Sequence, residues 1–365
     1  MTDAPVLSTR TLNRTLLQRQ FLAARTSRPV LDVVEHLVAL QGQEPNWPYV
    51  GLWTRLADFR HDDLMALLRD GRVVRSAALR STQHLTSSND FRWLRPVVQP
   101  VLDRTARAQY FAAQTAGLNI AELTDAGREL MAGHTLPRRK LALSLAERFP
   151  GRDGRVLAGA VELRVPMVHA PATGAWGAWG NRPNIAVTLA EHWIGRPMAA
   201  PRVETMIRRY LAAFGPAGVM DIQTWSGLTR LRETLDGLRS QLRVFHDERG
   251  TELFDLPDAP LADPDLPVPV RFLPAFDNLL LGHTDRARVI SEADRKLVMP
   301  GQAMVRPTFL IDGFVHGTWS VKGSVLLISP FRPLSQAGTQ EVLDEAERLL
   351  AFVAPDAAER RITFT

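Results

Sequence analysis

The feature that most constrains the fold is a recurring order of elements, three short helices followed by a β-hairpin. It is clearest between residues 203 and 255, where an amphipathic helix, a short helix and a candidate recognition helix precede two strands. These segments are Val203–Phe214, Val219–Trp225, Leu228–Leu238, Gln241–His246 and Thr251–Asp255. Such an order, closed by a tight turn between the strands, is the plan of a winged helix, a relative of the helix-turn-helix.

Two earlier parts of the chain follow similar orders. The first is predicted to contain three helices and a hairpin, at 30–40, 51–57, 61–70, Arg72–Leu79 and Gln83–Ser88. A long helix from an Asp90 cap to about Ala112 follows this hairpin. The second part contains helices at Ile120–Met131, from Pro137 and at Gly154–Leu163, and strands at Met167–His169 and Ile185–Leu189. A proline-rich stretch over 256–270 reads as a linker.

The pattern turns to strands after this linker. Short apolar strands are predicted at Val268–Pro274, Met304–Ile311, Phe314–Ser320, Ser324–Ser329 and Arg361–Phe364, with a helix over Gln336–Phe352. We therefore expect an α+β fold in which tandem winged-helix (helix-turn-helix) units form a concave cleft and a small antiparallel β module follows. The expected boundaries are 1–115, 116–200 and 201–256 for the three units and 257–365 for the linker and module.

Composition limits the chemistry and the compartment. The chain has no cysteine, so disulfides, thiolate chemistry and cysteine-ligated zinc are excluded. No apolar run reaches the ~20 residues of a membrane span, and the N-terminus lacks the apolar region of a signal peptide, so we expect a soluble cytoplasmic protein. Of the 44 cationic residues, 41 are arginine. Arginine suits phosphate contact and base stacking, and the alternative explanation of the bias is a GC-rich genome that favours arginine codons.

A polar pair interrupts an apolar segment early in the chain. Gln41 and Gln43 are two residues apart, and in an extended segment such side chains leave the backbone on the same side. Two neutral amides can then converge on one small target, such as a water molecule or a base edge. The alternative is a helix C-terminus with Gly42 as its stop.

The sequence resembles the bacterial AlkZ-like DNA glycosylases in four blocks. They are LNRTLLQRQFLAAR (12–25), LQGQEPNWPYVGLWTRL (40–56), VVRSAALRSTQHLTSSNDFRWLRP (73–96) and FLPAFDNLLLGHTDRARVI (272–290). The resemblance covers nearly the whole chain and implies tandem winged helices. It also places the family's catalytic Gln-x-Gln signature on Gln41 and Gln43. Gly42 departs from the aliphatic residue that is usual in the middle of this signature, and glycine relaxes the backbone there.

The resemblance further implies a reaction and a partner. The substrate would be double-stranded DNA that carries a cationic 7-alkylguanine, including bulky natural-product adducts, in repair that gives self-resistance to a genotoxic antibiotic. No cofactor, metal or protein partner is expected, and we expect a monomer. A lyase step needs an amine nucleophile, and the three lysines, Lys140, Lys296 and Lys322, lie far from Gln41 in sequence, which favours a monofunctional enzyme.

Further candidates for contact with substrate or DNA are aromatic, histidine and cationic residues. Trp47 and His84 lie in the family-like blocks, although a tryptophan between prolines and a lone histidine on a strand are commonly structural. Trp176 and Trp179 occupy a glycine-rich loop and are predicted to enter a groove, cover an adduct or pack on a neighbouring domain. The cationic candidates, for which a solvated surface is the alternative, are Arg138, Arg139, Lys140, Arg249 and Arg286.

Other enzyme classes lack their signatures in this sequence. The histidines form no HxH or HExxH pair, and neither a Gly-x-Gly-x-x-Gly loop, a P-loop nor a Gly-x-Ser-x-Gly elbow is present. The remaining rival is a non-catalytic winged-helix DNA-binding regulator or a drug-sequestering protein. A regulator is expected to be a symmetric dimer that reads spaced half-sites.

Overall fold

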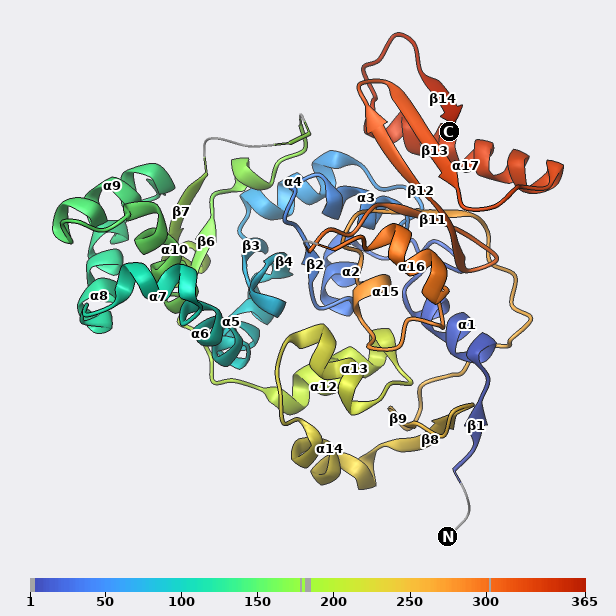
Figure 1. The fold of residues 1–365 in the computed structure, drawn as a ribbon, viewed down its shortest axis with the longest axis horizontal. Helices are drawn as coiled ribbons and strands as arrows, with labels where there is room; N and C mark the ends of the chain where they lie inside the picture. The colour runs from blue at the N-terminus through green and yellow to red at the C-terminus, as the bar shows by residue number, and fades with distance from the viewer. Residues whose placement is uncertain (1–3, 178, 181–184, 302) are drawn as a thin grey trace.

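The structure is a computed structural model that describes residues 4–177, 179–180, 185–301 and 303–365 (Figure 1). Its α-helices are α1 Thr9–Arg19, α2 Val30–His36, α3 Trp47–Trp53, α4 His61–Arg69, α5 Ser88–Val97, α6 Gln99–Ala106, α7 Gln109–Thr115, α8 Ile120–Met131, α9 Arg138–Arg148, α10 Gly154–Arg164, α11 Ala190–Ile194, α12 Val203–Phe214, α13 Val219–Ser226, α14 Arg232–Leu238, α15 Asn278–Leu281, α16 Glu292–Val298 and α17 Gln336–Val353. Its strands are β1 Val6–Leu7, β2 Leu40–Gln41, β3 Val73–Ala77, β4 Gln83–Ser87, β5 Leu136–Pro137, β6 Met167–His169, β7 Ala186–Leu189, β8 Arg243–Asp247, β9 Glu252–Asp255, β10 Arg271–Leu273, β11 Thr308–Ile311, β12 Phe314–Lys322, β13 Val325–Pro330 and β14 Arg361–Phe364. The predicted α+β class is confirmed.

The first two hairpins are parts of one antiparallel sheet with the strand order β2-β4-β3-β6-β7-β5. Strand β3 joins the two hairpins, because Arg75 on β3 pairs with His169 on β6. Side chains that lie about ninety residues apart in sequence therefore become neighbours. The sequence pattern predicted the strands but not this connection.

The segment after the first hairpin forms three helices instead of one. The predicted helix from Asp90 to Ala112 is divided into α5, α6 and α7, and its N-cap is Ser87, whose side chain accepts from the Asp90 N–H. Pro100 lies in the first turn of α6, where the missing N–H is tolerated but a continuous helix is not. The prediction of one long helix was wrong because Pro100 separates α6 from α5, and the extended backbone at Ala108 separates α7 from α6.

The third group contains α12, α13, α14 and the hairpin of β8 and β9, in the predicted order. The N-terminal strand β1 adds to this hairpin in parallel with β8, which the sequence pattern did not indicate. The assignment of these groups as tandem winged helices, their boundaries and the concave cleft stay predictions.

The C-terminal sheet has the order β10-β11-β12-β13-β14, and its strands β11–β14 are orange to red in Figure 1. Its last strand pairs in parallel with β13, with Val325 opposite Arg361. The prediction of a purely antiparallel module was wrong, because α17 carries the chain back along the sheet before β14 begins.

Three buried clusters hold these parts together. The largest joins α12–α14 to α5, α6 and α15. A second joins α2–α4 to the C-terminal sheet and α17, and a third lies among α8–α10, β6 and β7. The first sheet contributes side chains to all three clusters, and its strand β2 carries the first residue of the glutamine motif.

Candidate active site

The motif Gln41–Gly42–Gln43 starts on a strand rather than at the end of a helix. The predicted helix over 30–40 ends at His36, and Val38 has a φ of 67°, which a right-handed helix excludes. The chain then enters β2, where Gln41 pairs with His84 on β4. The predictions of a helix through residue 40 and of Gly42 as its stop were wrong, because Val38 turns the chain into the sheet.

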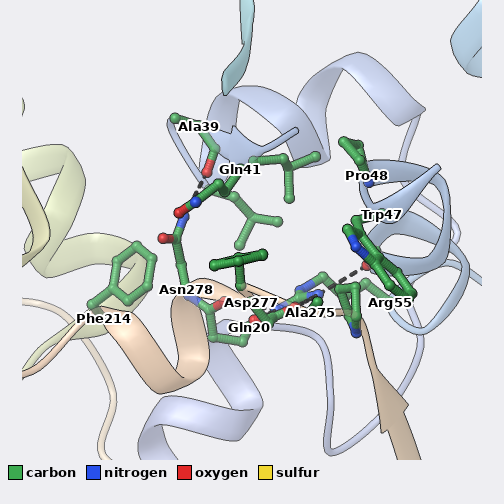
Figure 2. Close-up of a pocket in the computed structure, with 15 residues that line it drawn as sticks. Gln20, Ala39, Gln41, Trp47, Pro48, Arg55, Phe214, Ala275, Asp277 and Asn278 are labelled. Carbon is green, nitrogen blue, oxygen red and sulfur yellow. Dashed lines mark hydrogen bonds and ion pairs between the residues drawn. The ribbon is translucent and has the colours of Figure 1, made fainter. Parts of the chain in front are cut away.

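Gln41 is nearly buried, with 8% of its surface exposed. Its Oε1 accepts a hydrogen bond of 2.8 Å from Nη2 of Arg80. The same guanidinium donates to Oδ1 of Asn278 at 3.2 Å and to the carbonyl of Trp225, so Gln41 is tied to α15 and α13. Figure 2 shows Gln41 beside Asn278, around a small cavity of about 20 Å³ with room for about one water molecule. Burial, and then the positive charge of Arg286, lowers the pKa of Arg80 to about 10, which leaves it charged at neutral pH.

His84 is part of the support for Gln41 and is neutral. Burial, followed by the charge of Arg80, lowers the pKa of His84 to about 3. Its Nδ1 lies 2.9 Å from the carbonyl of Thr82 and donates to it, which leaves Nε2 as the acceptor for Arg80 at 3.4 Å. A histidine in this state fixes the guanidinium and supplies no acid at neutral pH.

Gln43, in contrast, is exposed. Its Oε1 accepts from the backbone N–H of Gln83 at 3.3 Å, and a carbonyl oxygen retains a second lone pair. Gln43 lines a cavity of about 400 Å³, within the range of small-molecule sites. The other residues around this cavity are Glu44, Pro45, Arg75, Gln83, Arg138, Glu162, His169, Thr173, Gly180 and Ile185. The two amides therefore line different cavities, and the predicted convergence on one target is not present in this structure.

Gly42 follows β2 and has little room for a side chain. A Cβ atom at this position would be 2.7 Å from Cδ1 of Leu85 and 3.2 Å from Cγ of Pro48. The Gly42 N–H donates to the carbonyl of Gln83 at 2.8 Å, and its carbonyl accepts from Nε of Arg75 at 2.9 Å. An aliphatic residue in the middle of the motif would therefore require Leu85 or Pro48 to move.

The two loop tryptophans pack on aromatic residues of the first unit. Trp176 stacks on His61 with 4.2 Å between ring centroids, and Trp179 lies 4.5 Å from Trp47. Two bonds between Asn46 and the backbone of Gly177, at 2.7 and 3.2 Å, hold the loop here. These contacts favour the packing alternative; contact of Trp47, Trp176 or Trp179 with DNA stays a prediction. Residues 178 and 181–184 lie outside the described part of the chain.

The predicted cations occupy different environments. Arg138 donates to Glu162 at 3.2 Å on the wall of the Gln43 cavity, whereas Arg139 and Lys140 are exposed at the start of α9. Arg249 lies in the turn between β8 and β9, and its guanidinium pairs with the carboxylate of Asp285 at 2.9 Å. Arg286 is partly buried and donates to the carbonyl of Leu280 at 2.8 Å, which indicates a structural role.

Sequence reasoning missed five polar residues at this site. They are Arg75, Arg80, Gln83, Glu162 and His169. Arg75, Arg80 and Gln83 lie inside the family-like block 73–96, where the abundance of polar residues on a predicted hairpin was a usable signal. Glu162 and His169 become visible only when β3 pairs with β6.

The described residues contain neither a membrane-spanning helix nor a cluster of metal-ligating side chains. No helix in this part of the chain has the length and apolar character needed to cross a membrane. No group of three or more histidine, aspartate or glutamate side chains is arranged there to hold a metal ion.

Comparison with known proteins identifies the same family as the sequence motifs. The sequence matches the family described as DNA glycosylase AlkZ-like over residues 34–352. It is 24% identical over 354 residues to the interstrand DNA cross-link repair glycosylase of Streptomyces sahachiroi, which covers 90% of this chain and 92% of the relative. The fold is similar to the solved structure of Streptomyces sahachiroi DNA glycosylase AlkZ, with a TM-score of 0.80, 23% identity and coverage of 99% of this chain and 100% of the other. Because the family match spans most of its length, the chain belongs to the AlkZ-like DNA glycosylase family.

Proposed function

We propose that this protein is a monofunctional DNA glycosylase that hydrolyses the N-glycosidic bond of a cationic 7-alkylguanine in double-stranded DNA and leaves an abasic site. The observation that carries the proposal is the exposed amide of Gln43 on a cavity of about 400 Å³, in a chain of this family. The cavity is large enough for a base and part of its substituent.

The chemistry requires little from the protein because the lesion is already activated. A 7-alkylguanine carries a positive charge, so it leaves as a neutral base when the bond to C1′ breaks, and no general acid is needed. Water then adds its oxygen to C1′ and releases a proton to solvent. The protein must hold this water and stabilise a partly cationic sugar, and an amide oxygen can do both. Undamaged guanine would need protonation and would resist excision.

The two glutamines have unequal roles in this mechanism. Gln43 orients the attacking water with the lone pair of Oε1 that the Gln83 N–H does not use. Gln41, whose Oε1 is held by Arg80, fixes the course of the motif at the end of β2, two residues before Gln43. No lysine is among the described residues around the Gln43 cavity, in keeping with hydrolysis without a lyase step.

Bulky natural-product adducts form the proposed substrate class, and self-resistance to a genotoxic antibiotic is the proposed role. The Streptomyces sahachiroi relative is named as an interstrand DNA cross-link repair glycosylase. We extend this substrate class to the present chain on the basis of the shared family and fold. The rings of Trp47 and Trp179 are partly buried and lie 4.5 Å apart, and Trp179 directly precedes Gly180, which lines the cavity.

Release of free base tests this function directly. Purified protein is incubated in excess chelator with synthetic duplexes that carry 7-methylguanine or a bulky 7-alkylguanine, and the soluble products are separated by chromatography. We expect free alkylated base and an intact abasic strand, with unmodified guanine untouched. Tight DNA or drug binding without base release would instead identify the non-catalytic regulator or sequestering protein.

A further inference from the structure

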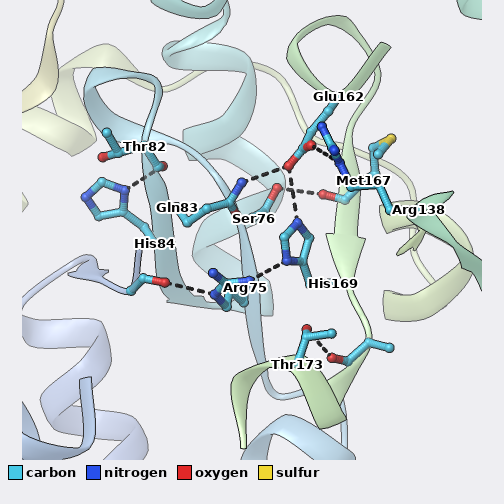
Figure 3. A network of polar contacts seen from close by, with 12 residues as sticks. Arg75, Ser76, Thr82, Gln83, His84, Arg138, Glu162, Met167, His169 and Thr173 are labelled. Carbon is cyan, nitrogen blue, oxygen red and sulfur yellow. Dashed lines mark hydrogen bonds and ion pairs between the residues drawn. The ribbon is translucent and has the colours of Figure 1, made fainter. Parts of the chain in front are cut away.

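A closed ring of hydrogen bonds lies along the cavity beside Gln43, and Figure 3 shows the part that runs through Arg75, His169, Glu162 and Gln83. Nη2 of Arg75 donates to the Gln43 carbonyl at 3.3 Å, and Nη1 of Arg75 donates to Nδ1 of His169. Nε2 of His169 then donates to Oε1 of Glu162 at 3.2 Å. Nε2 of Gln83 donates to the same Glu162 oxygen at 2.7 Å, and the Gln83 backbone N–H returns to Oε1 of Gln43. Both ends of the ring therefore hold Gln43, one through its backbone and one through its side chain.

Glu162 is the residue on which the ring depends. It projects from α10 into the sheet, its side chain is only 11% exposed, and its second oxygen accepts from Arg138 at 3.2 Å. Burial alone would raise the pKa of Glu162, but the His169 hydrogen bond and the charges around it lower this pKa to about 2, so the carboxylate is ionised. The bond to Glu162 is also the only side-chain hydrogen bond of Gln83 to the described residues, since Gln83 Oε1 has no partner among them.

We propose that Glu162 is a positioning residue for base excision, which orients Gln43 through Gln83 on one side and through His169 and Arg75 on the other. This inference rests on the proposed role of Gln43 in orienting water. Glu162 need not touch the substrate. It collects three donors on two oxygens, and each donor fixes a group that borders the cavity.

Glu162→Gln is the decisive variant because it keeps size and removes the charge and one acceptor. A glutamine has a single oxygen for the donors of His169, Gln83 and Arg138, and its own amide N–H groups would meet at least one of them. We expect single-turnover excision of 7-methylguanine to slow about tenfold, with DNA affinity within about threefold, because orientation of the water acts mainly in the transition state.

Glu345→Gln is the matched control. Glu345 is also a buried carboxylate, 7% exposed, and it is paired with Arg25 at 2.6 Å, but it lies on α17 outside the ring. We expect it to reduce thermal stability at least as much as Glu162→Gln while excision is unchanged. Equal slowing by both variants would mean that the loss is general destabilisation, and the proposal would fail.

A double-mutant cycle with Gln43→Ala separates this proposal from the proposed function. If Glu162 acts through Gln43, adding Glu162→Gln to Gln43→Ala should slow excision by less than about twofold. A full further tenfold loss would show independent action and overturn the positioning role. Unchanged excision in Glu162→Gln with a slow Gln43→Ala variant would overturn only the role of Glu162. Unchanged excision in Gln43→Ala would overturn the role of Gln43, and with it the positioning role, whereas absence of base release by the unsubstituted protein would overturn the proposed function.

Gln83→Met provides a second test if Glu162→Gln does not fold. Gln83 is only partly buried, and its backbone N–H still reaches Gln43 after the substitution, so the fold should survive. Loss of the side-chain bond to Glu162 should slow excision about threefold with DNA affinity retained. A rate equal to that of the unsubstituted protein would contradict the proposal.

Discussion

The surroundings of Gln41 and Gln43 differ sharply although the residues are only two positions apart. Gln41 is nearly buried, and a charged arginine occupies its amide oxygen. Gln43 is exposed, its oxygen meets one backbone N–H, and it borders a cavity about twenty times larger than the one beside Gln41. A repeated residue type in a motif therefore does not imply a repeated task. The buried amide is suited to support and the exposed amide to contact with substrate.

Arg80→Met should give the largest effect in the Gln41 region. The substitution keeps the length of the stem but leaves the side-chain oxygens of Gln41 and Asn278 without their donor. We expect a loss of about 3 kcal/mol in the free energy of unfolding, with excision slowed roughly tenfold. Denaturant titration and single-turnover assays measure the two effects.

Arg288→Met is the control for Arg80, because Arg288 is also a buried arginine that donates to a backbone carbonyl, that of Pro216, and lies beside a buried histidine, His283. It should destabilise the protein comparably and leave excision nearly unchanged in conditions where both variants are folded. If Arg80→Met retains full activity, the Gln41 region does not support the motif.

Gly42→Ala should show how the two regions are joined. The added Cβ would lie 2.7 Å from Cδ1 of Leu85, so the strand or the leucine must move. We expect a loss of about 2 kcal/mol in stability and slower excision, and Leu85→Val in the same chain should restore part of both. Gly51→Ala, whose nearest contact would be an ordinary 3.5 Å, should be neutral or slightly stabilising. Full activity and stability in Gly42→Ala would show that the strands are not packed as described.

His84→Gln should change the pH dependence of stability and give the smallest effect. Because the pKa of His84 is lowered to about 3 in the folded protein, only the unfolded chain binds its proton between about pH 6.5 and pH 3. The contribution of neutral His84 is fully present above pH 6.5 and is lost as the pH falls below it. Between pH 7 and pH 5, the unsubstituted protein should lose on the order of 1–2 kcal/mol more than His84→Gln. Equal losses would contradict a neutral, buried His84.

Local sequence patterns predicted local elements well. Helices α8 and α12 have the predicted bounds, and β14 does as well, because periodicity and turn residues are properties of neighbouring positions. The helix over 30–40 failed because Val38 takes a left-handed conformation, which is rare for a β-branched residue and has no local sequence signal. The parallel pairing of β14 and the union of two hairpins in one sheet also depend on tertiary contacts.

At the site, too, local sequence predicted the motif, whereas its environment depends on tertiary contacts. The family-like motif identified Gln41 and Gln43, but nothing in their spacing distinguished a buried amide from an exposed one. The partners that make the difference, Arg80 and Glu162, are brought in by the hairpin turn and by the pairing of Arg75 with His169. Their roles depend on strand register and burial, which a single sequence does not specify.

A side-by-side measurement of Gln43→Ala and Gln41→Ala tests most directly whether the exposed amide is the one that acts on substrate. Single-turnover release of 7-methylguanine, DNA affinity and the free energy of unfolding are determined for both variants. We predict that Gln43→Ala slows release roughly a hundredfold with stability and affinity nearly unchanged, as for loss of a group that acts in the transition state. Gln41→Ala should lose about 1–2 kcal/mol of stability, because Arg80 loses an acceptor, and should slow release less. Release by Gln43→Ala within about threefold of the unsubstituted rate, or a larger loss in a fully stable Gln41→Ala, would contradict this assignment.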